Sequence, residues 1–165
     1  KLFLMMKPHC AVFGSKDYQQ LAAIQRMVWD LNFGIEIIGA PIVREADGLA
    51  MSSRNAYLSE AEREAARCVP AATQAAQACV AAGEHDSTRI LEAVRQVIAA
   101  QPVAKLSYAD LADTETLERV QTIDRPVQLL LAVHIGQTRL IDNCRLVPQT
   151  SIASATTAAH MSESG

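Results

Sequence analysis

The hydrophobic positions at the beginning of the chain follow a strand, helix, strand order. Residues 9–14 form a short apolar run ending in glycine, which is typical of a buried parallel strand. Residues 15–34 predict a helix with Gly34 at its C′ position, because apolar side chains recur at helical spacing: Leu21, Ile24, Val28 and Leu31. The short β-branched segment 35–43 predicts a second strand. One βαβ unit of this kind implies a parallel sheet with a right-handed crossover.

A long helical segment follows after a break. Ser59 and Glu62 form a Ser-x-x-Glu capping box, which predicts a helix that begins near residue 60. The alanine-rich residues 61–82 continue this helix. Pro70 is expected to bend or interrupt it, because proline cannot donate a backbone hydrogen bond.

The next part of the chain predicts a second helix and then an antiparallel sheet. Asp86 or Ser87 is suited to cap a helix over residues 88–101. Beyond residue 102 the hydrophobic period changes to that of strands, and three are expected, over residues 104–113, 125–136 and 137–148. Gly136 and Gln137 are expected to join the last two in a tight hairpin.

This order of elements predicts two structural units. Residues 1–46 are expected to be the end of an α/β domain, and residues 47–148 a small α+β domain with two helices and three antiparallel strands. Residues 149–165 are small and polar without a hydrophobic period, which predicts a disordered tail.

Composition excludes several classes of function. Half of the 165 residues are hydrophobic, so the chain can bury a core. Nucleic-acid binding is disfavoured, since the net charge is -3, only 4% of residues are aromatic and no Lys/Arg block stands out. No apolar run reaches the roughly 18 residues that a membrane span needs. The apolar stretch of the opening KLFLMMKPHC is too short for a signal peptide.

Cysteines and histidines are scattered. The four cysteines contain no Cys-x-x-Cys pair and are expected to be reduced, mostly buried thiols of a cytoplasmic protein: Cys10, Cys68, Cys79 and Cys144. No histidine pairs with a carboxylate at a ligand-like spacing, so a zinc site is not expected.

The first candidate for ligand binding is the segment FGSKDYQQ, residues 13–20. Gly14 allows the backbone to turn sharply and to approach a ligand closely. The following helix start favours an anion, Lys16 adds a positive charge, and Asp17 could accept hydrogen bonds from ribose hydroxyls. Open α/β sheets bind ligands at this end of a strand. The alternative is an ordinary N-cap beside a solvated lysine.

The second candidate is the segment DGLAMSSRN, residues 47–55. Ser52 and Ser53 offer hydroxyl donors and Arg54 a guanidinium, all suited to phosphate oxygens. Gly48 is expected to let the segment flex, as a lid must. The alternative is a loop that only connects two domains. Each segment follows one of the parallel strands, so both can face the same crevice.

Three segments together resemble the pantothenate synthetase (pantoate–β-alanine ligase) family: AVFGSKDYQQLAAI, GAPIVREADGLAMSSRNAYLS and LLLAVHIGQTRLIDN. The resemblance runs over residues 1–148. It implies a nucleotidyltransferase with a Rossmann-like ATP-binding domain, of which residues 1–46 would be the C-terminal part. Residues 47–148 would be the lid domain, and the MSSR segment resembles the counterpart of the KMSKS signature.

The resemblance also implies a two-step reaction in a cytoplasmic homodimer. Pantoate attacks the α-phosphate of ATP to give pantoyl adenylate and pyrophosphate. The amine of β-alanine then attacks this mixed anhydride and releases AMP. Such chemistry needs charge neutralisation and positioning more than covalent participation by the protein.

Site residues follow from the match to the family's motifs. Gly14 and Asp17 would hold the ribose side of ATP, with Ser15 in the same ATP-binding loop. Lys16 would contact phosphate, and Gln20 would hydrogen-bond pantoate.

The second matched segment supplies the rest of the ATP site. Pro41 and Val43 would line the adenine pocket, and the backbone of Val43 would read the base. Four residues would close on the phosphates, which Mg²⁺ would bridge: Met51, Ser52, Ser53 and Arg54. Of all these residues, the catalytic ones would be Lys16, Ser52, Ser53 and Arg54.

One part of the family pattern is absent from the chain. The family's first helix opens with a His-x-Gly-His motif that binds the ATP phosphates, and no such motif precedes the first strand here. The HIGQ segment at 134–137 lies in the expected hairpin, so His134 is expected to be a structural strand residue. The chain opens like the end of a helix, and it is therefore expected to be an incomplete portion of the enzyme.

Two alternatives remain open. One is a non-catalytic nucleotide-binding or assembly fragment that keeps the closing loop. The other is a related adenylate-forming ligase for another hydroxy acid, because no residue by itself specifies the geminal methyl groups of pantoate.

Overall fold

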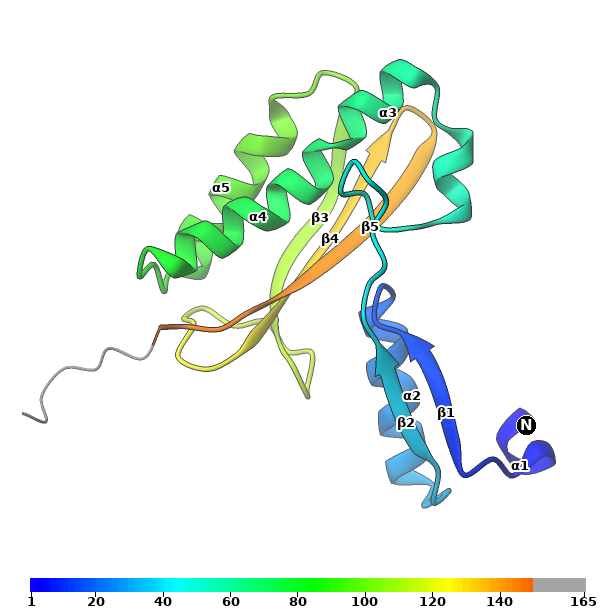
Figure 1. Cartoon of the computed structure of the whole chain (residues 1–165). Helices are drawn as coiled ribbons and strands as arrows, with labels where there is room; N and C mark the ends of the chain where they lie inside the picture. The colour runs from blue at the N-terminus through cyan, green and yellow to red at the C-terminus, as the bar shows by residue number, and fades with distance from the viewer. Residues whose placement is uncertain (150–165) are drawn as a thin grey trace, which may run out of the picture.

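The computed structural model describes residues 1–149, in which a small α/β part is followed by a larger α+β part (Figure 1). The α/β part contains α1 (Leu2–Met6), β1 (Cys10–Gly14), α2 (Tyr18–Asp30) and β2 (Glu36–Ala40). The α+β part contains the 3-10 helix η1 (Ser53–Tyr57), α3 (Glu60–Ala66), α4 (Cys68–Ala81), α5 (Ser87–Ala99), β3 (Ala104–Asp113), β4 (Val127–Ile135) and β5 (Thr138–Leu146). The expected fold class is confirmed. The predicted tail lies outside the described residues, apart from Gln149.

The two strands of the α/β part run parallel, as the βαβ pattern predicts. α2 packs closely on one face, where a Cβ at Gly39 would lie 2.9 Å from Leu21 Cδ2. The opposite face carries Val12, which is 62% exposed, and Ile38, which is 41% exposed. The prediction of a buried strand is therefore wrong for β1, because nothing among residues 1–149 covers this second face.

α2 ends two residues earlier than its glycine suggests. Asn32 adopts a left-handed φ of 51°. Its N–H donates to the carbonyl of Trp29, and the N–H of Phe33 donates to the carbonyl of Val28, which together form a Schellman motif. The prediction that Gly34 is the C′ residue is wrong, because asparagine also tolerates this conformation.

The long helical segment is divided into α3 and α4. The predicted capping box is present, since Ser59 accepts the N–H of Glu62 and the Glu62 carboxylate accepts the N–H of Ser59. The break lies at Arg67, so Pro70 is in the first turn of α4, where its missing N–H leaves no helical bond unmade. The expected interruption is confirmed, three residues before the proline.

α5 begins at the predicted cap. Asp86 accepts the N–H of Thr88 at 2.7 Å and that of Arg89 at 3.4 Å. α4 and α5 lie side by side on one face of the second sheet (Figure 1).

The three predicted antiparallel strands are all present, in the order β3-β4-β5. Ile135 pairs with Thr138 across the two-residue turn at Gly136 and Gln137, which confirms the tight hairpin. His134 lies in β4, with its Nδ1 2.9 Å from Ser107 Oγ, as expected of a structural strand residue. β4 is the central strand, and its helix-facing side chains form the centre of the core: Leu129, Leu131, Val133 and Ile135.

All four cysteines are free, yet only Cys68 is fully buried. Burial raises the pKa of Cys68 to about 11 and that of the partly buried Cys144 to about 12, so both stay protonated near neutral pH. The prediction of mostly buried thiols is wrong for Cys10, which is exposed on the open sheet of the α/β part. Within residues 1–149, no helix is long and apolar enough to cross a membrane.

Candidate functional site

The first candidate segment forms the connection between β1 and α2. The N–H of Ser15 extends the parallel ladder by donating to the carbonyl of Ala40 at 2.8 Å. Asp17 is the N-cap of α2, and its Oδ1 accepts the N–H of Gln20 at 3.3 Å. Asp17 is therefore an N-cap, as the alternative interpretation proposed, and this role uses one of its two carboxylate oxygens. The capped helix start also keeps Lys16 beside a helix N-terminus, where an anion is favoured.

Gly14 is the last residue of β1, and the chain turns directly after it, at Ser15 and Lys16. The φ of Gly14 lies outside the left-handed region, so this turn does not require a glycine there for its backbone conformation. A Cβ at Gly14 would have nothing within 4 Å, so the space in front of the strand end is open to a ligand.

The second candidate segment, residues 47–55, overlaps a small hairpin, defined here as residues 43–51. Its arms pair at Arg44 and Ala50, and Met51 donates its N–H to the carbonyl of Val43 at 2.9 Å. Gly48 occupies the turn with a φ of +87°. This turn is closed by hydrogen bonds and Leu49 is buried, so the glycine provides a left-handed turn. The expected flexibility of the segment stays a prediction.

Acidic residues of the hairpin anchor it to the elements that follow. Glu45 and Asp47 both form ion pairs with Arg63 of α3. Glu45 also accepts a hydrogen bond from the side chain of the buried Asn55 in η1. Ser52 caps η1 by accepting the N–H of Arg54 at 3.2 Å. The hairpin and the MSSR segment are therefore fixed to one another.

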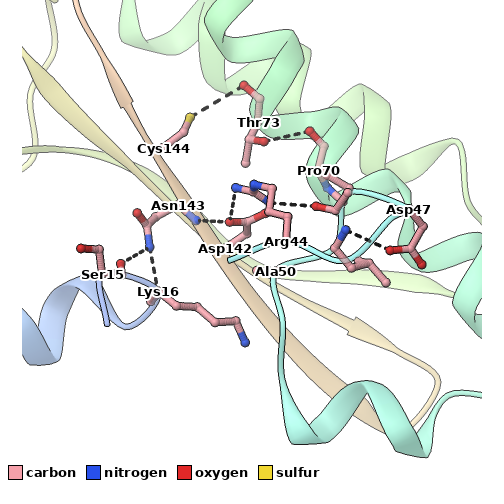
Figure 2. A network of polar contacts seen from close by, with 12 residues as sticks. Ser15, Lys16, Arg44, Asp47, Ala50, Pro70, Thr73, Asp142, Asn143 and Cys144 are labelled. Atoms are coloured by element: carbon pink, nitrogen blue, oxygen red, sulfur yellow. Dashed lines mark hydrogen bonds and ion pairs between the residues drawn. The ribbon is translucent and has the colours of Figure 1, made fainter. Parts of the chain in front are cut away.

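Both candidate segments are attached to β5 by adjacent residues (Figure 2). Asn143 Nδ2 donates to the carbonyl oxygens of Ser15 at 2.9 Å and of Lys16 at 2.8 Å. Asp142 forms a two-bond ion pair with Arg44 of the hairpin, at 2.8 and 3.0 Å. The hydrogen bond to Asp142 raises the pKa of Arg44, whereas burial opposes this rise.

The ammonium group of Lys16 points away from Asn143 (Figure 2). Burial lowers the pKa of Lys16 below its ordinary value of 10.5, Asp142 opposes this effect, and the positive charge of Arg54 lowers the pKa further. Arg54 therefore lies near enough to Lys16 for its charge to act on this ammonium group. Among residues 1–149, neither cation has a carboxylate within salt-bridge distance. Two neighbouring cations that form no salt bridge within the described residues favour an anion between them.

The remaining predicted residues lie at or near the surface. Val43 is 60% exposed and Met51 58% exposed. Pro41, Ser53 and Gln20 are also exposed, and Ser52 is half-buried. No hydrogen bond among the described residues joins the Gln20 side chain to the MSSR segment, so its role towards pantoate stays a prediction.

Arg44, Asp142 and Asn143 were missed as site residues. Their pairing joins positions about a hundred residues apart, which no local pattern records. A signal was nevertheless present, because two neighbouring polar residues in an apolar strand point to opposite faces and each needs a partner when buried.

Known proteins match nearly all of the described part of the chain. The family model described as pantoate-beta-alanine ligase matches residues 1–145. The pantothenate synthetase of Syntrophobacter fumaroxidans is 53% identical over 148 residues, which are 90% of this chain and 52% of that protein. That of Geobacter sulfurreducens is 51% identical over 146 residues, covering 88% of this chain and 52% of its own length.

Solved structures agree with this relationship. The pantothenate synthetase of Thermus thermophilus superposes with a TM-score of 0.84 at 38% identity, over 89% of this chain and 53% of that one. The pantoate-beta-alanine ligase of Francisella tularensis, solved in complex with beta-gamma ATP and beta-alanine, gives a TM-score of 0.61 at 28% identity, over 87% and 46%. The chain thus spans about half the length of the relatives that it matches.

Proposed function

Because the chain belongs to the pantoate–β-alanine ligase family, we propose that it contributes to the ATP-dependent condensation of pantoate with β-alanine. In the first step a carboxylate oxygen of pantoate bonds to the α-phosphorus of ATP, and pyrophosphate leaves. In the second step the amine nitrogen of β-alanine bonds to the acyl carbon of pantoyl adenylate. AMP then leaves, and the nitrogen loses a proton to form the amide of pantothenate.

The convergence of Lys16 and Arg54 carries this proposal. They come from two separate segments of the sequence, and the charge of Arg54 lowers the pKa of Lys16. β5 binds the first segment directly and the second through Arg44 of the hairpin. A polyphosphate would place oxygens next to both cations, where the negative charge that develops on the leaving pyrophosphate is stabilised. The hydroxyls of Ser52 and Ser53 would add uncharged donors to the same oxygens.

Residues on either side of the two cations would bind the nucleoside part of ATP. The open space at Gly14 admits the ribose, with Asp17 accepting from its hydroxyls beside Ser15. Exposed Pro41, Val43 and Met51 would cover the adenine ring. The carbonyl of Val43 already accepts the N–H of Met51, so the backbone N–H of Val43 is assigned to the edge of the base.

Mg²⁺ fits this site as a companion of the nucleotide. Residues 1–149 contain no group of three or more His, Cys, Asp or Glu that could hold a metal ion. Mg²⁺ in nucleotide sites takes most of its ligands from phosphate oxygens and water, so it would arrive with ATP and neutralise part of its charge. The acidic residue of the first candidate segment is Asp17, the N-cap of α2. Gln20 as the pantoate ligand, the cytoplasmic location and the homodimer rest on the family alone.

The test is pantoate-dependent release of pyrophosphate from Mg-ATP. It is measured with this chain alone and together with the part of the Syntrophobacter fumaroxidans relative that the chain does not match. We expect release with the combined polypeptides, and pantothenate and AMP once β-alanine is added. The exposed Lys105 on β3 supplies a control variant, Lys105→Met, which should release pyrophosphate at the unchanged rate.

Two outcomes of this test would support the alternatives instead. No release from polypeptides that are shown to be folded and associated would favour a non-catalytic nucleotide-binding fragment. Faster release with 2,4-dihydroxybutanoate, which lacks the two methyl groups of pantoate, would indicate a ligase for another hydroxy acid.

A further inference from the structure

Asn143 makes contacts that fix the backbone of the β1–α2 connection. It is only 4% exposed, and its Nδ2 lies between the carbonyl oxygens of Ser15 and Lys16. Its Oδ1 accepts a hydrogen bond from Gln128 Nε2 at 2.6 Å, and Gln128 is equally buried. With the oxygen used by Gln128, the amide can present only its donor side to the two carbonyls.

Asp142 makes the corresponding contact on the other face of β5. Its side chain is fully buried, and both oxygens bind the guanidinium of Arg44. Oδ1 also accepts the N–H of Asn143 at 2.8 Å, which stiffens the strand between the two side chains. Arg44 Nη1 donates further to the carbonyl of Gly48, so the ion pair also holds the turn of the hairpin.

The two contacts work together because neighbouring side chains of a strand point to opposite faces. Asp142 lies opposite Leu131, which belongs to the helix-covered core, whereas Asn143 lies opposite Leu130 on the other face. One peptide unit of β5 therefore connects the segment that carries Lys16 with the hairpin that leads to Arg54 (Figure 2).

We propose that Asn143 and Asp142 are positioning residues that set the distance between Lys16 and Arg54 for binding the phosphates of a nucleotide. This inference rests on the proposed function and adds to it the groups that arrange the site. Neither residue touches the nucleotide; Asn143 acts through the backbone of Ser15 and Lys16, and Asp142 acts through Arg44.

The test compares the affinity for Mg-ATP of three variants of the full chain by calorimetry, at a temperature well below their unfolding. Asn143→Leu keeps the approximate shape but removes both donations to the loop, and Arg44→Met releases the hairpin. Thr73→Val is the matched control, because it also removes a buried hydrogen bond from a side chain to a carbonyl, at 2.8 Å to Pro70, within α4. We expect the Kd for Mg-ATP to rise about tenfold or more in the first two variants and to stay unchanged in the control, because only they lose preorganisation.

Amide chemical shifts distinguish a local displacement of one segment from a general loss of structure. In the unliganded protein, Asn143→Leu should shift the signals of residues 14–17 and leave those of residues 44–50 in place, and Arg44→Met should do the reverse. If Asn143→Leu does not fold, Asn143→Ser is used, since serine keeps a polar group but cannot reach both carbonyls.

The outcomes separate the inference from its premise. If the wild-type chain binds Mg-ATP and both Asn143→Leu and Arg44→Met bind it with the same affinity, the positioning role is overturned and the proposed function is left intact. Equal loss of affinity in Thr73→Val would also overturn it, because general destabilisation would then explain the effect. If the wild-type chain does not bind Mg-ATP, alone or with the unmatched part of a relative, both proposals fail.

Discussion

Lys16 carries a positive charge in a half-buried position at the start of a helix. Burial lowers the pKa of Lys16, the negative charge of Asp142 opposes this effect, and the positive charge of Arg54 lowers the pKa further. A charge placed in this way is destabilised in the empty site and stabilised when an anion arrives. Under the proposed function, Lys16 would therefore favour the developing charge of a reacting phosphate, which is the interaction that accelerates a reaction.

Removal of either cation should slow the first chemical step. A preorganised donor at a developing charge contributes about 3 kcal/mol, so Lys16→Ala or Arg54→Ala should lower the rate of pyrophosphate release about 100-fold. Arg54 is exposed, so circular dichroism of its variant should remain that of the wild type. Unchanged turnover in both variants would contradict the assignment of these residues.

The lowered pKa of Lys16 also predicts proton uptake on nucleotide binding. A phosphate beside the ammonium favours its charged form, so the pKa rises on binding, and protons are taken up at pH values between the two pKa values. Calorimetry at a series of pH values up to the ordinary lysine pKa of 10.5, in two buffers of different ionisation enthalpy at each pH, measures this uptake. We expect uptake in the wild type and in Lys105→Met, and none in Lys16→Met. Equal uptake in all three proteins would place the titrating group elsewhere.

The same shift affects stability with a definite sign. As the pH rises through the lowered pKa of folded Lys16 towards 10.5, the unfolded chain holds more protons than the folded one. Lys16 therefore makes the free energy of unfolding increase with pH in that window, which is the reverse of the usual effect of a lysine that gains a partner.

At the scale of single residues, the sequence pointed to the two cations, whose roles stay predictions, but not to the residues that hold their segments in place. Lys16 and Arg54 stand in short motifs whose chemistry can be read locally. Asn143 and Arg44 act through long-range contacts, and their partners become adjacent only when β5 meets the α/β part. Tertiary pairing of this kind leaves no periodic signal.

The elements themselves were more predictable, because each has a local physical cause. The capping box at Ser59, the two-residue turn at Gly136 and the alternation of β3 were visible in the sequence and are present. Two predictions at this scale were wrong. Asn32 adopts the left-handed conformation expected of glycine, and β1 is exposed where its apolar sequence indicates burial.

Replacing Gly48 in the hairpin and Gly14 at the end of β1 by alanine should affect stability differently. Gly48 has a φ of +87°, so Gly48→Ala should lower the free energy of unfolding by about 1–2 kcal/mol. Gly14 has neither a left-handed φ nor a neighbour within 4 Å of a Cβ, so Gly14→Ala should change stability by less than about 0.5 kcal/mol. Urea unfolding measures both.

Gly14→Ala should nevertheless weaken Mg-ATP binding, because the added methyl group occupies the space assigned to the ribose. Gly14→Ala with unchanged affinity would show that the nucleotide does not approach the end of β1. A Gly48→Ala variant as stable as the wild type would show that the hairpin is not held in its left-handed turn in solution.

At the scale of the whole molecule, several polar contacts join the α/β part to the α+β part. Besides the contacts at β5, the Tyr18 hydroxyl donates to the carbonyl of Thr114 at 2.8 Å. These contacts connect the start of α2 to the second sheet. The α/β part supplies Lys16 and the α+β part supplies Arg54, so neither part contains the pair of cations alone. The domain boundary predicted near residue 46 falls within the hairpin that the ion pair of Arg44 and Asp142 attaches to β5, and it stays a prediction.

The central claim is that the two segments bind one nucleotide, and a titration of the 165-residue chain with Mg-ATP, followed by amide chemical shifts, tests it most directly. We predict that signals from residues 13–20 and from residues 43–54 shift together and give one Kd. Adenosine should shift the signals near Gly14 and Val43 but leave those of Ser53 and Arg54 unchanged, because it carries no phosphate. Shifts confined to one segment, or two different Kd values, would contradict a shared site.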